Sequence, residues 1–76
     1  MIITFEINTP FINLQQLLKA VNIAESGGHA KVLIDEGEVW VNNMQEFKKR
    51  RKLYPGDVVK VLNEEIKVTE NRKHAD

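Results

Sequence analysis

The sequence contains no cysteine, only two prolines and four glycines, and no long apolar run. Without cysteine, neither a disulfide framework nor a thiolate metal site can supplement the core, and this pattern is typical of a reducing environment. No basic leader is followed by an apolar segment, and no segment approaches the length of a membrane span. We therefore expect a cytoplasmic protein that does not enter a membrane.

A net charge is also lacking, because eleven basic residues balance eleven acidic ones. A neutral chain does not attract polyanions through its overall field. The charges are nevertheless distributed unevenly, since five consecutive basic residues, KKRRK, occupy positions 48–52 and the acidic residues concentrate elsewhere, as in DEGE at 35–38.

A chain of 76 residues predicts one small domain, here residues 1–70, followed by a frayed tail at 71–76 that has no apolar period.

Apolar periodicity predicts one strand and then two helices. Apolar and polar side chains alternate along residues 2–7, which predicts a strand, and we expect this strand at an edge of the sheet. Residues 13–21 place leucines on one helix face and begin with the capping-box pair Asn13 and Gln16. Ser26 caps a second helix, which runs to about Glu36 and is stopped by Gly37. The link between the helices is so short that they should pack as neighbours.

After the second helix the period changes to that of strands. Residues 38–42 alternate, and the asparagines at 42 and 43 tolerate the left-handed conformations of a tight hairpin. A turn at Tyr54–Asp57 precedes a strand at 58–62, and a further turn at 63–65 leads to a last strand at 66–69. The sequence thus predicts an α+β fold in which two packed N-terminal helices cover a small, mainly antiparallel β-sheet.

No catalytic or metal-binding group stands out. Ser26 and His29 are three residues apart, but the serine is already explained as a cap. Asp35 lies about 9 Å further along the helix axis, which is too far to orient His29. His74 is distant, and two separated histidines without cysteine do not make a metal site. We expect no enzymatic activity, no metal, no cofactor and no small-molecule substrate.

Two glycines, Gly27 and Gly28, stand in the first turn of the second helix. Two explanations remain open for them. Glycine leaves the unpaired N–H groups of a helix N-terminus bare, so that a phosphate can approach, and Lys31 would add a charge one turn later. Alternatively, the glycines let the helix pack closely against another element.

The basic run, Lys48–Lys52, favours a polyanionic partner because five like charges in succession repel one another. The alternatives are a solvated loop or a localisation signal. In an extended run, Lys48, Arg50 and Lys52 would share one face and the other two cations the opposite face. No more than about three cations could then contact one polyanion backbone.

Several of these features occur in a set order over residues 13–61: Ser26, Ala30 with Lys31, Gly37, Val39, Val41, Asn42, and Gly56 with Asp57. In this order they resemble the ribosomal-protein-S4-type RNA-binding domain, also called the alpha-L motif. The segments SGG, AK, VN and RKLY-x-GDVV are most similar to the small stand-alone bacterial YaaA-like branch. The chain departs from the wider family at Asn13–Gln15, where Arg-Leu-Asp is common, and at Gly27, where arginine is frequent.

The resemblance implies a non-catalytic protein that binds structured RNA, either ribosomal RNA or tRNA, across both helices and the following hairpin. We expect the contacts to be made through a basic hairpin, which carries the run Lys48–Lys52, and a helix N-terminus. Trp40, on the outward face of its strand, would stack on an unpaired base or pack against a neighbouring side chain. The candidate RNA-binding residues are Ser26, Gly27, Gly28, Lys31, Trp40, Asn42, Asn43, Lys48, Lys49, Arg50, Arg51 and Lys52. The alternative is a protein-interaction module that docks an acidic partner on the basic run, with Trp40 as its anchor.

Overall fold

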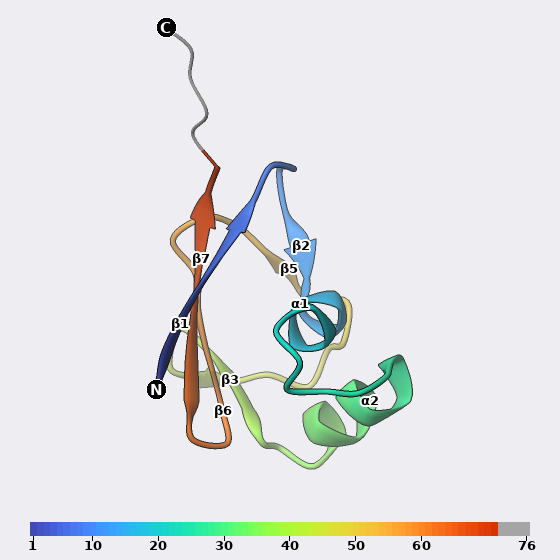
Figure 1. Cartoon of the computed structure of the whole chain (residues 1–76). Coiled ribbons are helices and arrows are strands. Elements are labelled where there is room, and N and C mark those ends of the chain that lie inside the picture. The colour runs from blue at the N-terminus through green and yellow to red at the C-terminus, as the bar shows by residue number, and fades with distance from the viewer. Residues whose placement is uncertain (72–76) are drawn as a thin grey trace, which may run out of the picture.

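The computed structural model describes residues 1–71, and the last five residues of the chain lie outside the description. Figure 1 shows the elements along the chain. They are β1 (Ile2–Ile7), β2 (Ile12–Asn13), α1 (Leu14–Ala20), α2 (Gly27–Asp35), β3 (Val39–Val41), β4 (Met44–Gln45), β5 (Lys52–Leu53), β6 (Val58–Val61) and β7 (Glu64–Glu70). Neither helix of the described part is long and apolar enough to cross a bilayer.

The strands form a five-stranded sheet and a separate two-stranded ribbon. The sheet has the order β1-β7-β6-β3-β4, in which β1 and β7 are parallel and the other neighbours antiparallel. The first and last strands therefore lie side by side, and β1 is an edge strand as predicted (Figure 1). The antiparallel ribbon pairs β2 with β5. The α+β class is confirmed, although β1 and β2 precede the two helices.

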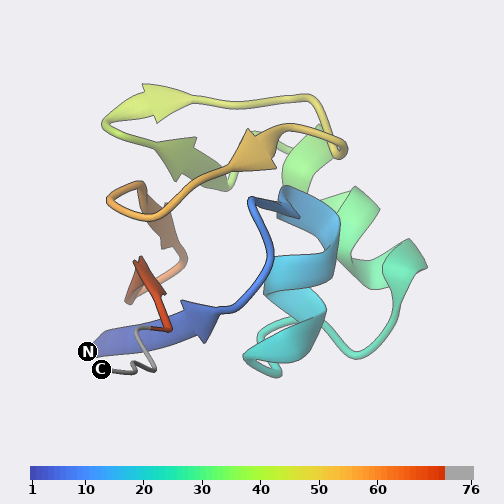
Figure 2. The same cartoon turned by 90° about the horizontal axis from the view of Figure 1, so that it is seen from above.

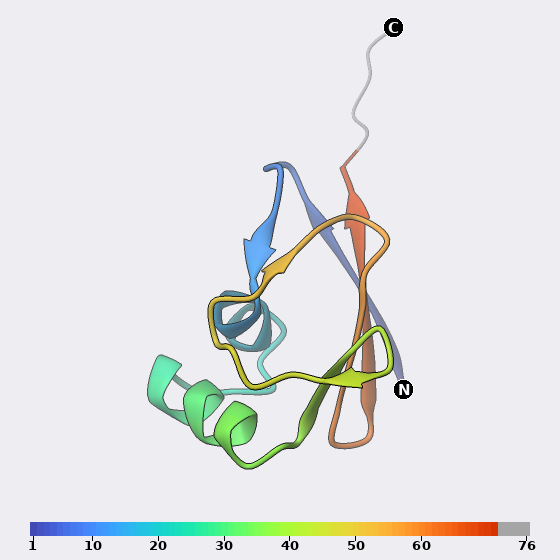
Figure 3. The ribbon, with the colours of Figure 1, turned by 180° about the vertical axis from the view of Figure 1, so that it is seen from behind.

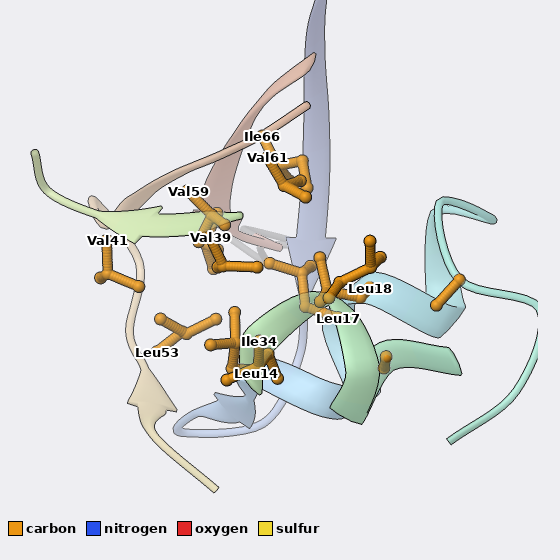
Figure 4. Close-up of a cluster of buried hydrophobic side chains, with 14 of the residues drawn as sticks. Leu14, Leu17, Leu18, Ile34, Val39, Val41, Leu53, Val59, Val61 and Ile66 are labelled. Atoms are coloured by element: carbon orange, nitrogen blue, oxygen red, sulfur yellow. The ribbon is translucent and has the colours of Figure 1, made fainter. Parts of the chain in front are cut away.

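The hydrophobic core lies between the helices and one face of the sheet (Figure 4). Because successive side chains of a strand alternate, Val39 and Val41 are buried while Trp40 is exposed on the other face. The core is built mainly from Leu14, Leu17, Leu18, Ala30, Leu33, Ile34, Val39, Val41, Leu53, Val59, Val61, Ile66 and Val68. We call the face of the sheet turned away from these side chains the outer face.

The helix ends follow the local sequence. The capping box of α1 is formed, since Asn13 Oδ1 accepts from the Gln16 N–H at 3.0 Å and Gln16 Oε1 accepts from the Asn13 N–H at 3.3 Å. Ser26 Oγ caps α2 by accepting from the His29 N–H at 3.1 Å. Gly37, with φ of 77°, follows the end of α2 in the left-handed region that glycine adopts without strain. These predicted boundaries are confirmed.

Two tight turns join neighbouring strands of the sheet. Asn42 and Asn43, with φ of 51° and 69°, make the reversal between β3 and β4 that was predicted. The predicted turn at 63–65 is wrong, because the reversal between β6 and β7 lies at Leu62 and Asn63 and the following glutamates already belong to β7. Asn71 continues that strand's pairing, since its N–H donates to the Ile7 carbonyl at 2.9 Å. The rest of the predicted tail, 72–76, lies outside the described residues.

Leu62 has a φ of 57°, although its side chain is 60% exposed and therefore contributes little burial. A left-handed conformation costs a non-glycine residue roughly 1–2 kcal/mol, whereas glycine adds about 0.5–1 kcal/mol of unfolded-state entropy. We expect Leu62→Gly to raise the free energy of unfolding by about 0.5–1 kcal/mol in urea denaturation. Leu62→Ala keeps the Cβ and should give no gain. Equal stabilities of the two variants would show that Leu62 is not strained.

Candidate functional site

The basic run lies in the loop that joins β4 to β5, rather than in a hairpin. β4 pairs with β3 and β5 pairs with β2, so the loop passes from the sheet to the ribbon. Within it, Lys48 and Arg51 close a turn in which the Arg51 N–H donates to the Lys48 carbonyl at 3.1 Å. Lys52 is the first residue of β5. The run is therefore a turn followed by a short strand.

The loop exposes three of its five cationic side chains. Lys48, Arg50 and Lys52 are exposed, whereas Lys49 and Arg51 are partly buried. Arg51 Nη1 lies 2.6 Å from Glu46 Oε1, and the other oxygen of that carboxylate accepts from the Lys48 N–H at 3.1 Å. The ion pairs found within residues 1–71 are Arg51–Glu46 and Lys31–Asp35. Neither involves one of the three exposed cations. Their charge is thus available to an anionic partner.

The first turn of α1 holds this loop in place. The Leu14 N–H donates to the Arg51 carbonyl at 2.9 Å, and the Gln15 N–H donates to the Lys49 carbonyl at 3.0 Å. Together with the bond from Gln16 to its cap, these contacts occupy the donors that a helix N-terminus leaves unpaired. The N-terminus of α1 is therefore used to position the basic run and is closed to an external anion.

Gln15 also connects the loop to the second helix. Its side-chain Nε2 donates to the Gly27 carbonyl at 2.9 Å, while its backbone N–H holds Lys49. A Cβ on Gly27 would come within 2.9 Å of this Nε2 atom, so a larger residue there would displace the end of the Gln15 side chain and with it this hydrogen bond. Sequence reasoning noted Gln15 only as a departure from the family pattern and did not foresee this link. The only available signal was a polar residue in the first turn with no capping role of its own.

The N-terminus of α2, in contrast, retains free donors. Ser26 Oγ takes the His29 N–H, and no acceptor within the described chain pairs with the N–H groups of Gly27 or Gly28. Gly28 is exposed, and an added Cβ there would meet nothing closer than Ser26 Oγ at 3.8 Å. Packing therefore does not account for Gly28. This helix end has the geometry of an anion seat, beside the loop that Gln15 fixes.

Lys31 does not stand beside the N-terminus of α2, as its spacing suggested. Its Nζ lies 2.7 Å from Asp35 Oδ2, one turn further toward the C-terminal end. Both side chains are about half exposed, with 53% and 52% of their surface accessible, so the pair is weak and screened. In this structure Lys31 therefore adds no charge to the helix N-terminus.

The remaining candidates lie in a second place, at the reversal between β3 and β4. The side chain of Asn42 ties this reversal to the start of β6. Its Nδ2 donates to Asp57 Oδ1 at 3.1 Å and its Oδ1 accepts from the Val58 N–H at 3.0 Å. Asn43 is exposed and contacts Lys60 Nζ through Oδ1 at 3.4 Å. From this reversal the chain runs through β4 into the basic loop. Figures 2 and 3 show the reversal at the far end of this segment from the helices, and the basic loop beside them.

Trp40 lies on the outer face of the sheet, whereas the basic run is bound to the first turn of α1. Its side chain is 42% exposed on the outer face, where its cross-strand neighbours are Gln45 and Lys60. The structure therefore brings together Ser26, the glycine pair and the basic run, and leaves Trp40 and the hairpin asparagines apart from them.

The structural role of Asn42 can be separated from that of its neighbour. Glycine accepts the φ of both positions, so Asn42→Gly removes two side-chain hydrogen bonds without backbone strain. We expect this variant to lose about 1–2 kcal/mol of unfolding free energy in urea denaturation. Asn43→Gly, the matched control, should stay within about 0.5 kcal/mol of the wild type. Equal losses in both variants would contradict the role given to Asn42.

Comparison with known proteins identifies the family of this chain. The family model described as the S4 domain matches residues 5–69. The chain is 46% identical over 55 residues to the probable ribosome maturation protein RlbA of Bacillus subtilis (strain 168), which covers 72% of this chain and 78% of that protein. It is 37% identical over 59 residues to the putative RNA-binding protein YbcJ of Escherichia coli (strain K12), covering 78% and 84% respectively. The resemblance found from the residues is confirmed, and the chain belongs to the S4-domain family.

Proposed function

We propose that this protein binds structured RNA, ribosomal RNA or tRNA, without catalysing a reaction. The binding surface consists of the exposed cations of the basic run and the N-terminus of α2. The observation that carries the proposal is the double contact of Gln15, which donates to the Lys49 carbonyl at 3.0 Å and to the Gly27 carbonyl at 2.9 Å. Two features that are far apart in the sequence, each suited to phosphate, thereby form one surface.

The proposed contacts are made to the nucleic-acid backbone. Lys48, Arg50 and Lys52 supply positive charge for phosphates, and the bare N–H groups at the α2 N-terminus donate to a further phosphate oxygen. Backbone contacts carry no base identity, so this surface selects a spatial arrangement of phosphates. A folded RNA presents such an arrangement, whereas a flexible strand must be ordered on binding. The names of the two relatives, a probable ribosome maturation protein and a putative RNA-binding protein, support the same assignment.

The acidic-partner hypothesis needs the basic run and Trp40 on one surface. Trp40 instead lies on the outer face of the sheet, whereas the basic run lies beside α1. An acidic protein docked on the run would therefore lose the aromatic anchor that the hypothesis assigned to it. We retain the RNA proposal because it uses only groups that lie together.

The proposal can be tested by titrating folded ribosomal RNA and tRNA at several salt concentrations. We expect the double variant Lys48→Ala with Arg50→Ala to bind more weakly, and its plot of log affinity against log salt to flatten by about 1.4–1.8 units for two lost phosphate contacts. The matched control, Lys60→Ala with Lys67→Ala, removes the same charge from exposed positions of the outer face. It should leave the slope nearly unchanged.

Equal flattening in both double variants would mean that RNA is attracted only by total charge, which contradicts the assigned surface. No saturable binding by the wild type at low salt would refute RNA binding itself. Loss of folding does not confuse the result, because cations beside a helix N-terminus are unfavourable and their removal should keep or slightly raise stability. Urea denaturation of each variant checks this.

A further inference from the structure

The ribbon formed by β2 and β5 carries an aromatic cluster next to the basic run. In its register Ile12 faces Leu53 and Asn13 faces Lys52. Leu53 is fully buried and Ile12 packs against the core, so this pair marks the inner side of the ribbon. Because side chains alternate along a strand, the flanking residues project from the opposite side. They are Phe11, Asn13, Lys52 and Tyr54.

Phe11 contacts two of the other side chains, those of Tyr54 and Lys52. The rings of Phe11 and Tyr54 are tilted by 52° with centroids 6.0 Å apart, which is a favourable geometry for an aromatic pair. Lys52 Nζ lies 4.8 Å from the Phe11 centroid, within the range of a cation–π contact. Phe11 is thus engaged by both neighbours. Tyr54 remains 48% exposed, the more accessible of the two rings.

Tyr54 is also held rigidly at its backbone. Its N–H donates to Asp57 Oδ2 at 2.8 Å, and its carbonyl accepts from the Asp57 N–H at 2.9 Å. Pro55 follows, which restricts the backbone of the preceding residue to extended conformations. A tyrosine side chain has only two rotatable χ angles. An exposed ring fixed in this way loses little entropy when another ring stacks on it.

The cluster adjoins the proposed phosphate surface. Lys52 belongs to both, since it ends the basic run and contacts Phe11, and its partner Asn13 is the N-cap of α1. We propose that Tyr54 is a stacking platform for an unpaired base of the RNA whose backbone the basic run holds. Phe11 positions the tyrosine, and Lys52 faces the phosphate of the stacked nucleotide. This inference rests on the proposed function and narrows its ligand to folded RNA with a single-stranded nucleotide beside a helix.

Unpaired bases are the parts of RNA that stack on aromatic side chains, because paired bases are already stacked within the helix. Trp40 was the sequence-based candidate for this role. It lies on the outer face of the sheet, opposite Lys60, whereas the basic run bonds to the first turn of α1. With 42% of its surface exposed it nevertheless resembles Tyr54 in accessibility. Trp40 is therefore a matched control for the loss of an exposed aromatic ring.

The test uses two RNA hairpins with the same stem, one blunt and one with a short single-stranded extension that contains a fluorescent adenine analogue. We expect the wild type to bind the extended hairpin more tightly and to quench the analogue by stacking. Tyr54→Ala should lose about five-fold or more in affinity for the extended hairpin and keep its affinity for the blunt one. Tyr54→Phe, which retains the ring, and Trp40→Ala should behave like the wild type.

Each other outcome has a distinct meaning. If the wild type binds both hairpins equally and does not quench the analogue, the stacking inference is wrong while phosphate binding stands. If Tyr54→Ala weakens both hairpins equally, the tyrosine supports the loop and does not stack, which also overturns the inference. If neither hairpin binds at low salt, the proposed function fails and the inference fails with it. Thermal melting confirms that the compared variants are folded.

Discussion

The candidate interface depends on where the first turn of α1 directs its backbone N–H groups. Leu14 and Gln15 donate to carbonyls of the basic loop, and the side chain of Gln15 reaches the first turn of α2. These bonds replace the water or ligand that would otherwise satisfy a helix N-terminus. A loop that belongs to no hairpin thereby acquires a fixed shape, and the second helix is placed beside it. Without this turn, the cations and the glycine pair would have no defined relation.

The basic loop lies beside the N-terminus of α1, where added positive charge is electrostatically unfavourable in the free protein. The N-terminus of a helix carries a partial positive charge, and the loop adds cationic side chains next to it. Glu46 offsets part of this charge by pairing with Arg51 and accepting from the Lys48 N–H, and it does so largely buried, with 13% of its side chain exposed. The carboxylate fixes the loop but leaves Lys48, Arg50 and Lys52 without ion pairs in the described chain. The remaining repulsion is what a phosphate backbone would relieve.

Local interactions explain which parts of the fold could be predicted from the sequence. The bonds between Asn13 and Gln16, and between Ser26 and His29, span three residues, so the helix starts followed from the pattern. The ribbon and the loop could not be predicted, because two-residue strands have no period and their pairing joins segments distant in the sequence. For the same reason, alternation showed that Trp40 points outward but not that the basic run lies elsewhere. The role of Gln15 depends on two such distant contacts.

The glycine pair shows how structure separates residues that look equivalent in sequence. Glycine costs roughly 1 kcal/mol against alanine in helix interior, and at most that in the first turn, where Gly27 and Gly28 stand. Gly27 has a reason within the fold, since a Cβ there would displace Gln15 Nε2, 2.9 Å away, and with it the bond to the Gly27 carbonyl. Gly28 has none, because a Cβ there would meet only Ser26 Oγ at an ordinary 3.8 Å, yet its N–H is bare and exposed. We therefore propose that Gly28 serves a partner outside the fold, which at a helix N-terminus beside a cationic loop would be an anion.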